Sequence, residues 1–253
     1  MVERATSNES VRRYIKGAHI MGAVAEATTG TPISSETLEK WESLFSSVRI
    51  VDDRVDNINS LEERQEFYKN VKMSLKGNAG VFSSDVQLSE AMNSVRSLSE
   101  SLSERERANF LGALGGTLKV TEKIKTEENP DRFSFLTRLE GQFMSRAFIS
   151  LLPDEYRKRS RYRNLAKIIV RIGRSGNSLD SFFDLPDDYK YGEVKIRPTL
   201  GNRVRLLKNS VCDVGYILKS VKPSKKLAGY LGCTVFGLTQ NRSKKERLNT
   251  FQD

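Results

Sequence analysis

Three aspartates in residues 48–57, VRIVDDRVDN, have the side-chain type and spacing to bind a divalent cation. Residues four apart on a helix lie one above the other, about 5–6 Å apart, so Asp52 and Asp56 form a pair that Asp53 flanks. Carboxylates at this spacing repel each other, and this pair borders an apolar stripe, where uncompensated charge is costly. Mg²⁺ suits such a site because it prefers oxygen ligands and keeps water and phosphate oxygens in its shell. We therefore expect Asp52, Asp53 and Asp56 to bind Mg²⁺.

Two arginines in the same segment allow a simpler interpretation. Arg49 and Arg54 could neutralise Asp53 or Asp56 in a row of solvated ion pairs. Short acidic motifs also have many false positives. The first segment alone does not decide between a metal site and an ion-paired surface.

A second acidic segment, residues 171–198, carries an amide and two carboxylates at helical spacing. Asn177 lies three residues before Asp180, and Asp184 lies four after it, so all three can share one helix face. Four cationic side chains flank them: Arg171, Arg174, Lys195 and Arg197. Metal ions bind bridging phosphate oxygens while Arg and Lys neutralise the remaining charge. The segment predicts that Asn177, Asp180 and Asp184 bind Mg²⁺ and that the four cations bind a diphosphate.

The alternative for the second segment is an acidic surface loop at residues 184–188. Pro186 is expected to disturb the helix after Asp184, and such a loop would account for Asp187 and Asp188. It would not account for the helical spacing before it. The two acidic segments also lie far apart in the chain on two predicted helices, and facing helices of a bundle are a common place for metal sites.

The elements that must position these side chains are predicted to be helices. Apolar residues recur at helical spacing between the six prolines, Gly30 suits a helix C-terminal cap, and strand signals are weak. The expected helices cover about residues 8–27, 34–55, 61–75, 84–102, 103–125, 133–152, 154–184, 199–220 and 225–238. No fixed-period repeat or linker divides the chain. We therefore expect residues 1–253 to form one all-α, single-domain helical bundle.

Composition narrows the classes of function. The sequence is 38% hydrophobic and 29% charged, as in globular proteins, and no stretch approaches the roughly 20 apolar residues of a membrane-spanning helix. The polar N-terminus and the two cysteines, which lack metal-ligand spacing, favour a cytoplasmic protein with reduced thiols. The single histidine, His19, excludes a multi-histidine metal site. The net charge of +10 fits phosphorylated ligands, nucleic acids or anionic membranes and does not choose among them.

The stretch Asp52-Asp53-Arg54-Val55-Asp56 matches the DDxxD signature of class I isoprenoid (terpenoid) synthases. The second segment is similar to the distal motif of squalene and phytoene synthases, in which an Asn precedes spaced Asp residues and then Gly and Pro. Its matching residues are Asn177, Asp180, Asp184, Asp188, Gly192 and Pro198. The chain thus resembles this superfamily, nearest to squalene/phytoene synthase-like proteins and small bacterial prenyltransferases.

The resemblance implies an isoprenoid synthase-type bundle around a central apolar cavity, with Mg²⁺ bound to an isoprenyl diphosphate. It implies catalytic roles for Asp52, Asp56, Asp180 and Asp184, because metal and cations stabilise the departing diphosphate as an allylic carbocation forms. Aromatic faces stabilise such cations, so the candidate pocket residues are Phe45, Phe143, Phe148 and Phe182. Gly141 is a candidate kink in a broken helix lining the pocket; the alternative is a glycine where two helices cross closely.

Residues 225–253 form a candidate membrane-surface tail. An apolar stretch at residues 227–238 is bracketed by basic clusters and is too short to span a bilayer. It could contact an anionic membrane at its inner face, near a lipid-like acceptor. The alternative is a last core helix followed by a solvated basic tail.

The leading functional hypothesis is a Mg²⁺-dependent prenyltransferase that ionises an allylic isoprenyl diphosphate and transfers the prenyl group to an acceptor. A class I terpene synthase that cyclises or hydrates the same substrate is one alternative. A non-enzymatic basic helical adaptor or nucleic-acid-binding protein is another, supported by the net charge. We expect isoprenyl diphosphate and a lipid-like acceptor as partners, do not favour nucleic acid, and leave open whether the chain forms a homodimer.

Overall fold

The structure, a computed structural model, describes residues 8–221 except 59, 79 and 159. In this part of the chain 81% of the residues are helical and no strand occurs, which confirms the all-α prediction. The helices are α1 (Asn8–Thr29), α2 (Ser35–Asp56), α3 (Leu61–Leu75), α4 (Val86–Glu100), α5 (Glu104–Thr126), α6 (Pro130–Ser150), α7 (Asp154–Arg157), α8 (Tyr162–Lys190) and α9 (Leu200–Ser220). The predicted helix at 225–238 and the predicted tail at 225–253 lie outside the described residues.

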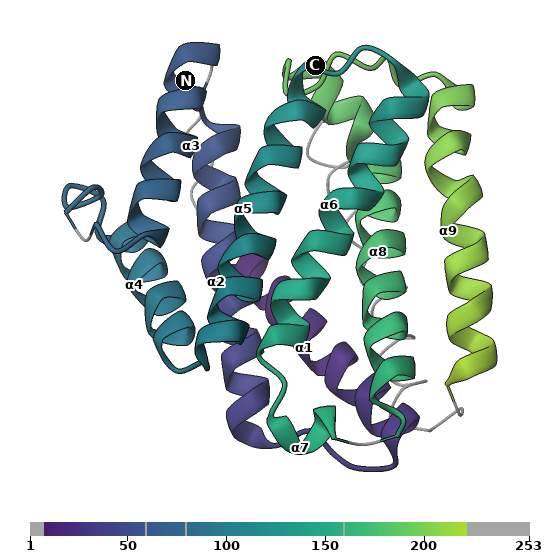
Figure 1. Ribbon diagram of the computed structural model, residues 1–253. Helices are drawn as coiled ribbons and strands as arrows, with labels where there is room; N and C mark the ends of the chain where they lie inside the picture. The colour runs from purple at the N-terminus through teal and green to yellow at the C-terminus, as the bar shows by residue number, and fades with distance from the viewer. Residues whose placement is uncertain (1–7, 59, 79, 159, 222–253) are drawn as a thin grey trace.

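Helices α5, α6, α8 and α9 stand in a row, each packed against the next, while α2, α3 and α4 form the other side of the bundle (Figure 1). Helix α1 crosses behind and packs against both α2 and α8. The α2–α3, α5–α6 and α8–α9 loops gather at the upper end of the bundle in Figure 1, and the short α7 lies at the opposite end. The C-terminal ends of α2, α5 and α8 therefore share one end of the molecule.

Local sequence signals fix where several helices begin and end. Helices α3, α6 and α9 begin at Ser60, Asn129 and Thr199, whose side chains accept hydrogen bonds from backbone N–H groups of the first turn. Helix α1 ends before Gly30, which adopts a positive φ of 76°, as the sequence predicts for a C-terminal cap.

Contrary to expectation, Pro186 does not end the second acidic helix. Helix α8 continues past it to Lys190. A proline lacks the N–H that would bond the carbonyl four residues earlier, here that of Phe182. Arg203 of α9 supplies the missing donor: its Nε donates to the Phe182 carbonyl at 3.1 Å, and its guanidinium lies 4.4 Å from the centre of the Phe182 ring. Residues 184–188 are therefore helical and do not form the acidic loop considered as the alternative.

Helices α6 and α8 cross in close contact at two glycines. A Cβ atom built on Gly141 would lie 2.1 Å from the carbonyl oxygen of Gly173, and one built on Gly173 would lie 2.4 Å from that of Gly141. Ser145 strengthens the crossing by donating to the Ile169 carbonyl at 3.1 Å. Helix α6 is continuous from Pro130 to Ser150, so Gly141 permits the close crossing and does not break the helix.

No helix in the described ranges is long and apolar enough to cross a membrane. Of the two cysteines, Cys212 is exposed and free, and Cys233 lies outside the described residues. The cytoplasmic location and the peripheral membrane contact stay predictions.

Candidate functional site

A cavity of about 260 Å³ lies between the two sides of the bundle, lined by side chains from α2, α3, α4, α5, α6 and α8. Most of its walls are apolar, with Phe45, Val48 and Val51 from α2, Val71 from α3, and Met92 and Val95 from α4. Its acidic and amide lining residues are Asp52, Glu140, Asn177 and Asp180. The two acidic segments predicted from the sequence thus meet at one largely apolar cavity.

The first segment divides its three carboxylates among different partners. Asp52 lines the cavity and accepts from Arg49 at 3.2 Å. Asp53 also pairs with Arg49, so one arginine holds both neighbouring aspartates. Asp56 pairs with Lys125 of α5, whose Nζ lies 2.7 Å from its Oδ1. The ion-pair interpretation therefore holds for Arg49, and Lys125 is a partner that the sequence did not indicate.

Arg54, the other arginine of this segment, faces away from these carboxylates towards α4. Its Nε donates to Asp85 Oδ2 at 2.6 Å, and Asp85 in turn accepts from the Leu88 backbone N–H as the N-terminal cap of α4. Arg54 therefore anchors α2 to α4 and does not neutralise the acidic cluster.

Burial makes the ionised form of Asp52 costly. The Asp52 side chain is 38% exposed and lines the cavity. Burial raises the pKa of Asp52 well above its ordinary value, and the Asp56 carboxylate raises it further, against a smaller opposing effect of Arg49. A divalent cation in the cavity would remove this cost.

Glu140 of α6 is a half-buried acid of the site that the sequence did not assign. The Thr121 hydroxyl donates to its Oε1, and the Asn177 amide donates to its Oε2 at 2.6 Å. Burial raises the pKa of Glu140, although both hydrogen bonds lower it. The acid is thus held in place from α5 and α8 while it faces the cavity.

Asn177 joins the second segment to Glu140. Its Nδ2 donates both to Glu140 and to the Thr137 carbonyl, the latter at 3.1 Å, so its Oδ1 is the atom available to a cation. Asp180 lines the cavity one turn further along α8. Asp184 is exposed and does not reach the lining. Of the three metal ligands predicted in the second segment, Asn177 and Asp180 therefore line the cavity and Asp184 does not.

Tyr68 adds a donor from α3. The residue is 2% exposed and lines the cavity, and within the described part of the chain its hydroxyl has no hydrogen-bond partner. Burial raises the pKa of this phenol, followed by the negative charges of Asp52 and Glu140, so it stays protonated. A buried hydroxyl without a partner is costly, so its O–H is poised to donate to a ligand oxygen.

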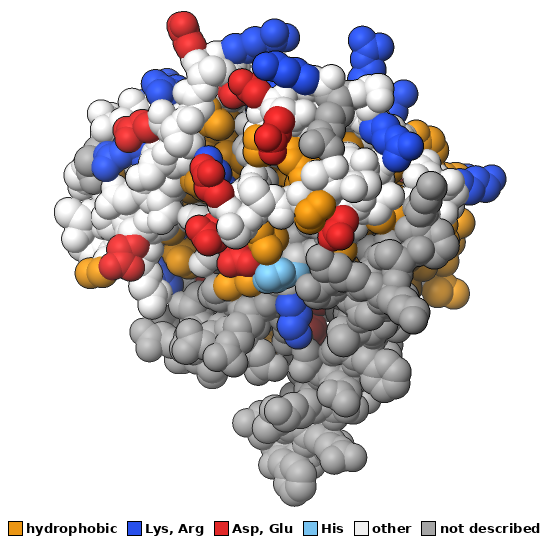
Figure 2. Space-filling model, turned by 90° about the horizontal axis from the view of Figure 1, so that it is seen from below, with side chains coloured by type: hydrophobic (Ala, Val, Ile, Leu, Met, Phe, Trp, Pro, Cys, Tyr) orange, Lys and Arg blue, Asp and Glu red, His pale blue; other side chains and the backbone are white. Residues whose placement is uncertain are grey.

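The backbone adds negative charge at the upper end of the bundle. Asp56 is the last residue of α2, and Asp188 lies in the last turn of α8, where the helix dipole opposes a carboxylate. Burial, then Glu193 and Asp184, raise the pKa of Asp188 to about 8. Burial lowers the pKa of Lys125, but Asp56, Asp52 and Glu193 raise it more, so this lysine stays charged beside them. At the opposite end, acidic and basic side chains are interspersed among uncharged ones (Figure 2).

Most of the other predicted residues lie outside the cavity lining. Arg171 and Arg174 face Asp213 of α9, at 2.6 Å and 3.8 Å. Lys195 pairs with Glu128 in the loops at the upper end, and Arg197 is exposed near it in sequence.

Among the predicted pocket residues Phe45 lines the cavity. Phe148 packs in the core against Trp41 and Phe45, and Phe143 and Phe182 pack in a second core cluster. Gly141 lies at the helix crossing.

The donor chemistry fits Mg²⁺ bound together with a phosphate ligand. Among the described residues, no group of three or more His, Cys, Asp or Glu side chains is arranged to hold a metal ion by itself. Mg²⁺ does not need such a cage, because it is usually held by one or two carboxylates together with waters and substrate phosphates. Asp52, Asp180 and the Asn177 amide oxygen are ligands of this kind on one cavity.

Comparison with known proteins places the chain in no family: no protein-family model, curated protein or solved structure matches it.

Proposed function

We propose that the protein is a Mg²⁺-dependent enzyme that ionises an allylic isoprenyl diphosphate and transfers the prenyl group to an acceptor. One observation carries the proposal: Asp52 of α2 and Asp180 of α8 line the same largely apolar cavity. A substrate with a hydrocarbon chain and a diphosphate head needs both an apolar chamber and a cation site at its wall. The cavity would serve as this chamber, and the carboxylates on its wall would form the cation site.

Asp52, Asn177 and Asp180, which line the cavity, are the residues that would hold Mg²⁺ between the protein and the diphosphate, with Asp56 beside them in its pair with Lys125. When bound, Mg²⁺ neutralises the charge that builds up on the diphosphate as it leaves. Asp53 pairs with Arg49, and Asp184 is exposed outside the cavity lining. Neither is proposed to bind the metal directly. The raised pKa of Asp52 agrees with a carboxylate whose ionised form needs a metal partner.

The remaining contacts orient the substrate. The O–H of Tyr68, which lines the cavity, would donate to a diphosphate oxygen, and the ammonium of Lys125, which pairs with Asp56, would add positive charge beside the metal site. The aliphatic walls exclude water from the prenyl chain. Phe45 lines the cavity, and its ring would help to stabilise the allylic cation.

Release of pyrophosphate from geranyl, farnesyl and geranylgeranyl diphosphate, with Mg²⁺ or with EDTA, tests this function. We expect Mg²⁺-dependent release by the intact chain and a loss of roughly 10²-fold or more in Asp52→Asn and Asp180→Asn. Asp154→Asn, a change at an exposed carboxylate of α7 at the opposite end of the bundle, is the matched control and should retain full release. Equal rates in all four proteins would refute the metal assignment.

Analysis of the organic product separates the two enzymatic alternatives. A prenyl group recovered on a lipid-like acceptor identifies a transferase. A cyclic hydrocarbon or a prenyl alcohol identifies a terpene synthase. A basic adaptor would instead bind heparin or DNA in a strongly salt-dependent way and release no pyrophosphate.

A further inference from the structure

A second charged cluster lies on the far side of α6 and α8, where α9 packs against them. Asp213 of α9 is 2% exposed and is surrounded by three guanidinium groups. Arg138 Nη2 and Arg171 Nη1 donate to its two carboxylate oxygens at 2.9 Å and 2.6 Å, and Arg174 Nε lies 3.8 Å away. Three partly buried cations thus share one carboxylate.

The positive charge in this cluster exceeds what Asp213 can neutralise. Arg171 is fixed by its bond to Asp213 and by stacking 4.0 Å from the centre of the Tyr216 ring. Arg174 has no hydrogen bond within the described part of the chain, although its side chain is only 32% exposed. Burial lowers the pKa of Arg138, and the nearby charge of Arg174 lowers it further. Like charges held together at this burial need a further anion.

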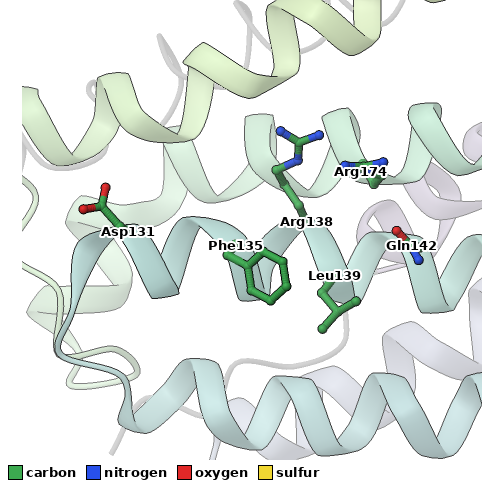
Figure 3. A pocket seen from close by; sticks show the side chains of 6 residues that line it. All are labelled: Asp131, Phe135, Arg138, Leu139, Gln142 and Arg174. Atoms are coloured by element: carbon green, nitrogen blue, oxygen red, sulfur yellow. The ribbon is translucent and has the colours of Figure 1, made fainter.

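A groove of about 270 Å³ opens beside these arginines. Figure 3 shows Arg174 and Gln142 at one end and Asp131 at the other, with Arg138 between them. Between the two ends lie Leu139 and Phe135, the latter 63% exposed. The groove therefore combines two guanidinium groups and an amide with an adjoining apolar strip.

We propose that this groove binds a phosphate-bearing amphiphile, with the phosphate on Arg138 and Arg174 and the apolar chain over Leu139 and Phe135. Guanidinium groups bind phosphate oxygens through paired, charge-assisted hydrogen bonds, and Gln142 supplies one more donor. The carboxylate of Asp131 does not oppose the ligand, because it lies at the far end and pairs with Arg205 at 3.0 Å. The ligand is either a free organic phosphate or the head group of an anionic lipid.

Binding of monomeric dodecyl phosphate to the full chain in EDTA, measured by calorimetry, tests the site. EDTA removes any metal-dependent binding in the central cavity. We expect Arg174→Gln to weaken binding roughly tenfold, because it removes a charge-assisted hydrogen bond to the phosphate. Arg146→Gln removes the same charge from an exposed position on α6 outside the groove and should leave binding unchanged.

A second variant probes the apolar strip without touching a charge. Phe135→Ala removes a side chain that is mostly in water, so the fold should tolerate it. It should weaken dodecyl phosphate binding several-fold and leave the weaker binding of inorganic phosphate unchanged. If Arg174→Gln, Phe135→Ala and Arg146→Gln all bind dodecyl phosphate as the unaltered chain does, the proposal is overturned.

Sedimentation with vesicles identifies the source of the phosphate. Binding to phosphatidylcholine vesicles that contain phosphatidic acid, lost in Arg174→Gln but kept in Arg146→Gln, assigns the groove to a lipid head group. Calorimetric binding without this vesicle effect assigns it to a free organic phosphate. Asp180→Asn should bind dodecyl phosphate in EDTA normally, so this site and the proposed catalytic site can fail independently.

Discussion

Asn177 donates from its amide nitrogen to Glu140 Oε2 at 2.6 Å, which ties the second acidic segment to a half-buried acid of the neighbouring helix. Because the amide nitrogen of Asn177 is used in this bond and in the bond to Thr137, its orientation is fixed with the oxygen left to bind a cation. Glu140 is thus the residue that orients a predicted metal ligand, and it contributes its own charge to the same cavity wall.

Glu140→Gln removes that charge and keeps the size of the side chain. We expect the affinity for Mg²⁺ and pyrophosphate together to fall about tenfold or more, as for other residues that orient metal ligands. Stability in EDTA should not fall, because the change removes a half-buried carboxylate whose pKa is raised by burial. Calorimetry and urea unfolding measure the two effects, with Glu90→Gln, an exposed change on α4, as control. Unchanged affinity would remove Glu140 from the site.

Lys125→Met leaves Asp56 without its cation inside the bundle. The Lys125 side chain is only 9% exposed, so the unfolding free energy should fall by roughly 3 kcal/mol in EDTA. Mg²⁺ should restore more stability to this variant than to the unaltered chain, because it replaces the missing charge. Thermal unfolding with and without Mg²⁺ measures this difference. Lys123→Met, an exposed change on the same helix, should show neither effect.

Gly141→Ala would place a methyl group against the Gly173 carbonyl, at a distance no native contact adopts. The two helices must separate, so the unfolding free energy should fall by about 2 kcal/mol or more. Gly112→Ala is the matched control, because a Cβ there meets no atom within 4 Å and alanine favours a helix by about 0.5–1 kcal/mol. Urea unfolding should show opposite signs for the two changes. Equal effects would contradict the close crossing.

The raised pKa of Asp188 predicts how the stability of the protein in EDTA depends on pH. Its pKa is about 8 in the folded protein, against an ordinary value of 3.8, so the folded state keeps a proton that the unfolded chain releases. Stability contributed by that proton is complete below about pH 4 and is lost as the pH rises to about 8. Between about pH 5 and pH 8 the unaltered chain should lose at least about 1 kcal/mol more stability than Asp188→Asn. If Asp188→Asn follows the same pH profile as the unaltered chain and as Asp154→Asn, Asp188 does not titrate in this way.

Helix positions follow from the sequence because their signals are local. Caps such as Ser34 and Gly30 and the apolar periodicity of α2 lie within one turn of the boundaries they set. The extension of α8 past Pro186 depends instead on Arg203, which lies on the next helix. No pattern within α8 predicts that contact, which is why the helix was expected to end earlier. We also expected a single helix over residues 154–184, whereas the structure has two helices there, α7 and α8.

The candidate site could also be predicted from the sequence only where it depends on positions along one helix. Spacing along one helix places Asp52 with Asp56 and Asn177 with Asp180, because these pairs depend only on the helical repeat. Glu140, Lys125 and Tyr68 join them across helices, and this depends on how each helix is rotated about its axis. The position of Glu140 beside Gly141 was the one available signal, since a glycine at a close crossing brings its neighbour near the adjoining helix. Arg171 and Arg174 precede Asp180 on the same helix but face α9.

The most direct test of the central claim is a double-mutant cycle on Asp52 and Asp180, read as the affinity for pyrophosphate in Mg²⁺ minus that in EDTA. If both side chains bind one metal–diphosphate complex, Asp52→Asn and Asp180→Asn should each abolish most of the Mg²⁺-dependent affinity. The double variant should then be hardly weaker than either single one, because the two changes remove the same complex. Additive losses, or Mg²⁺-dependent affinity that survives in both single variants, would contradict a shared site.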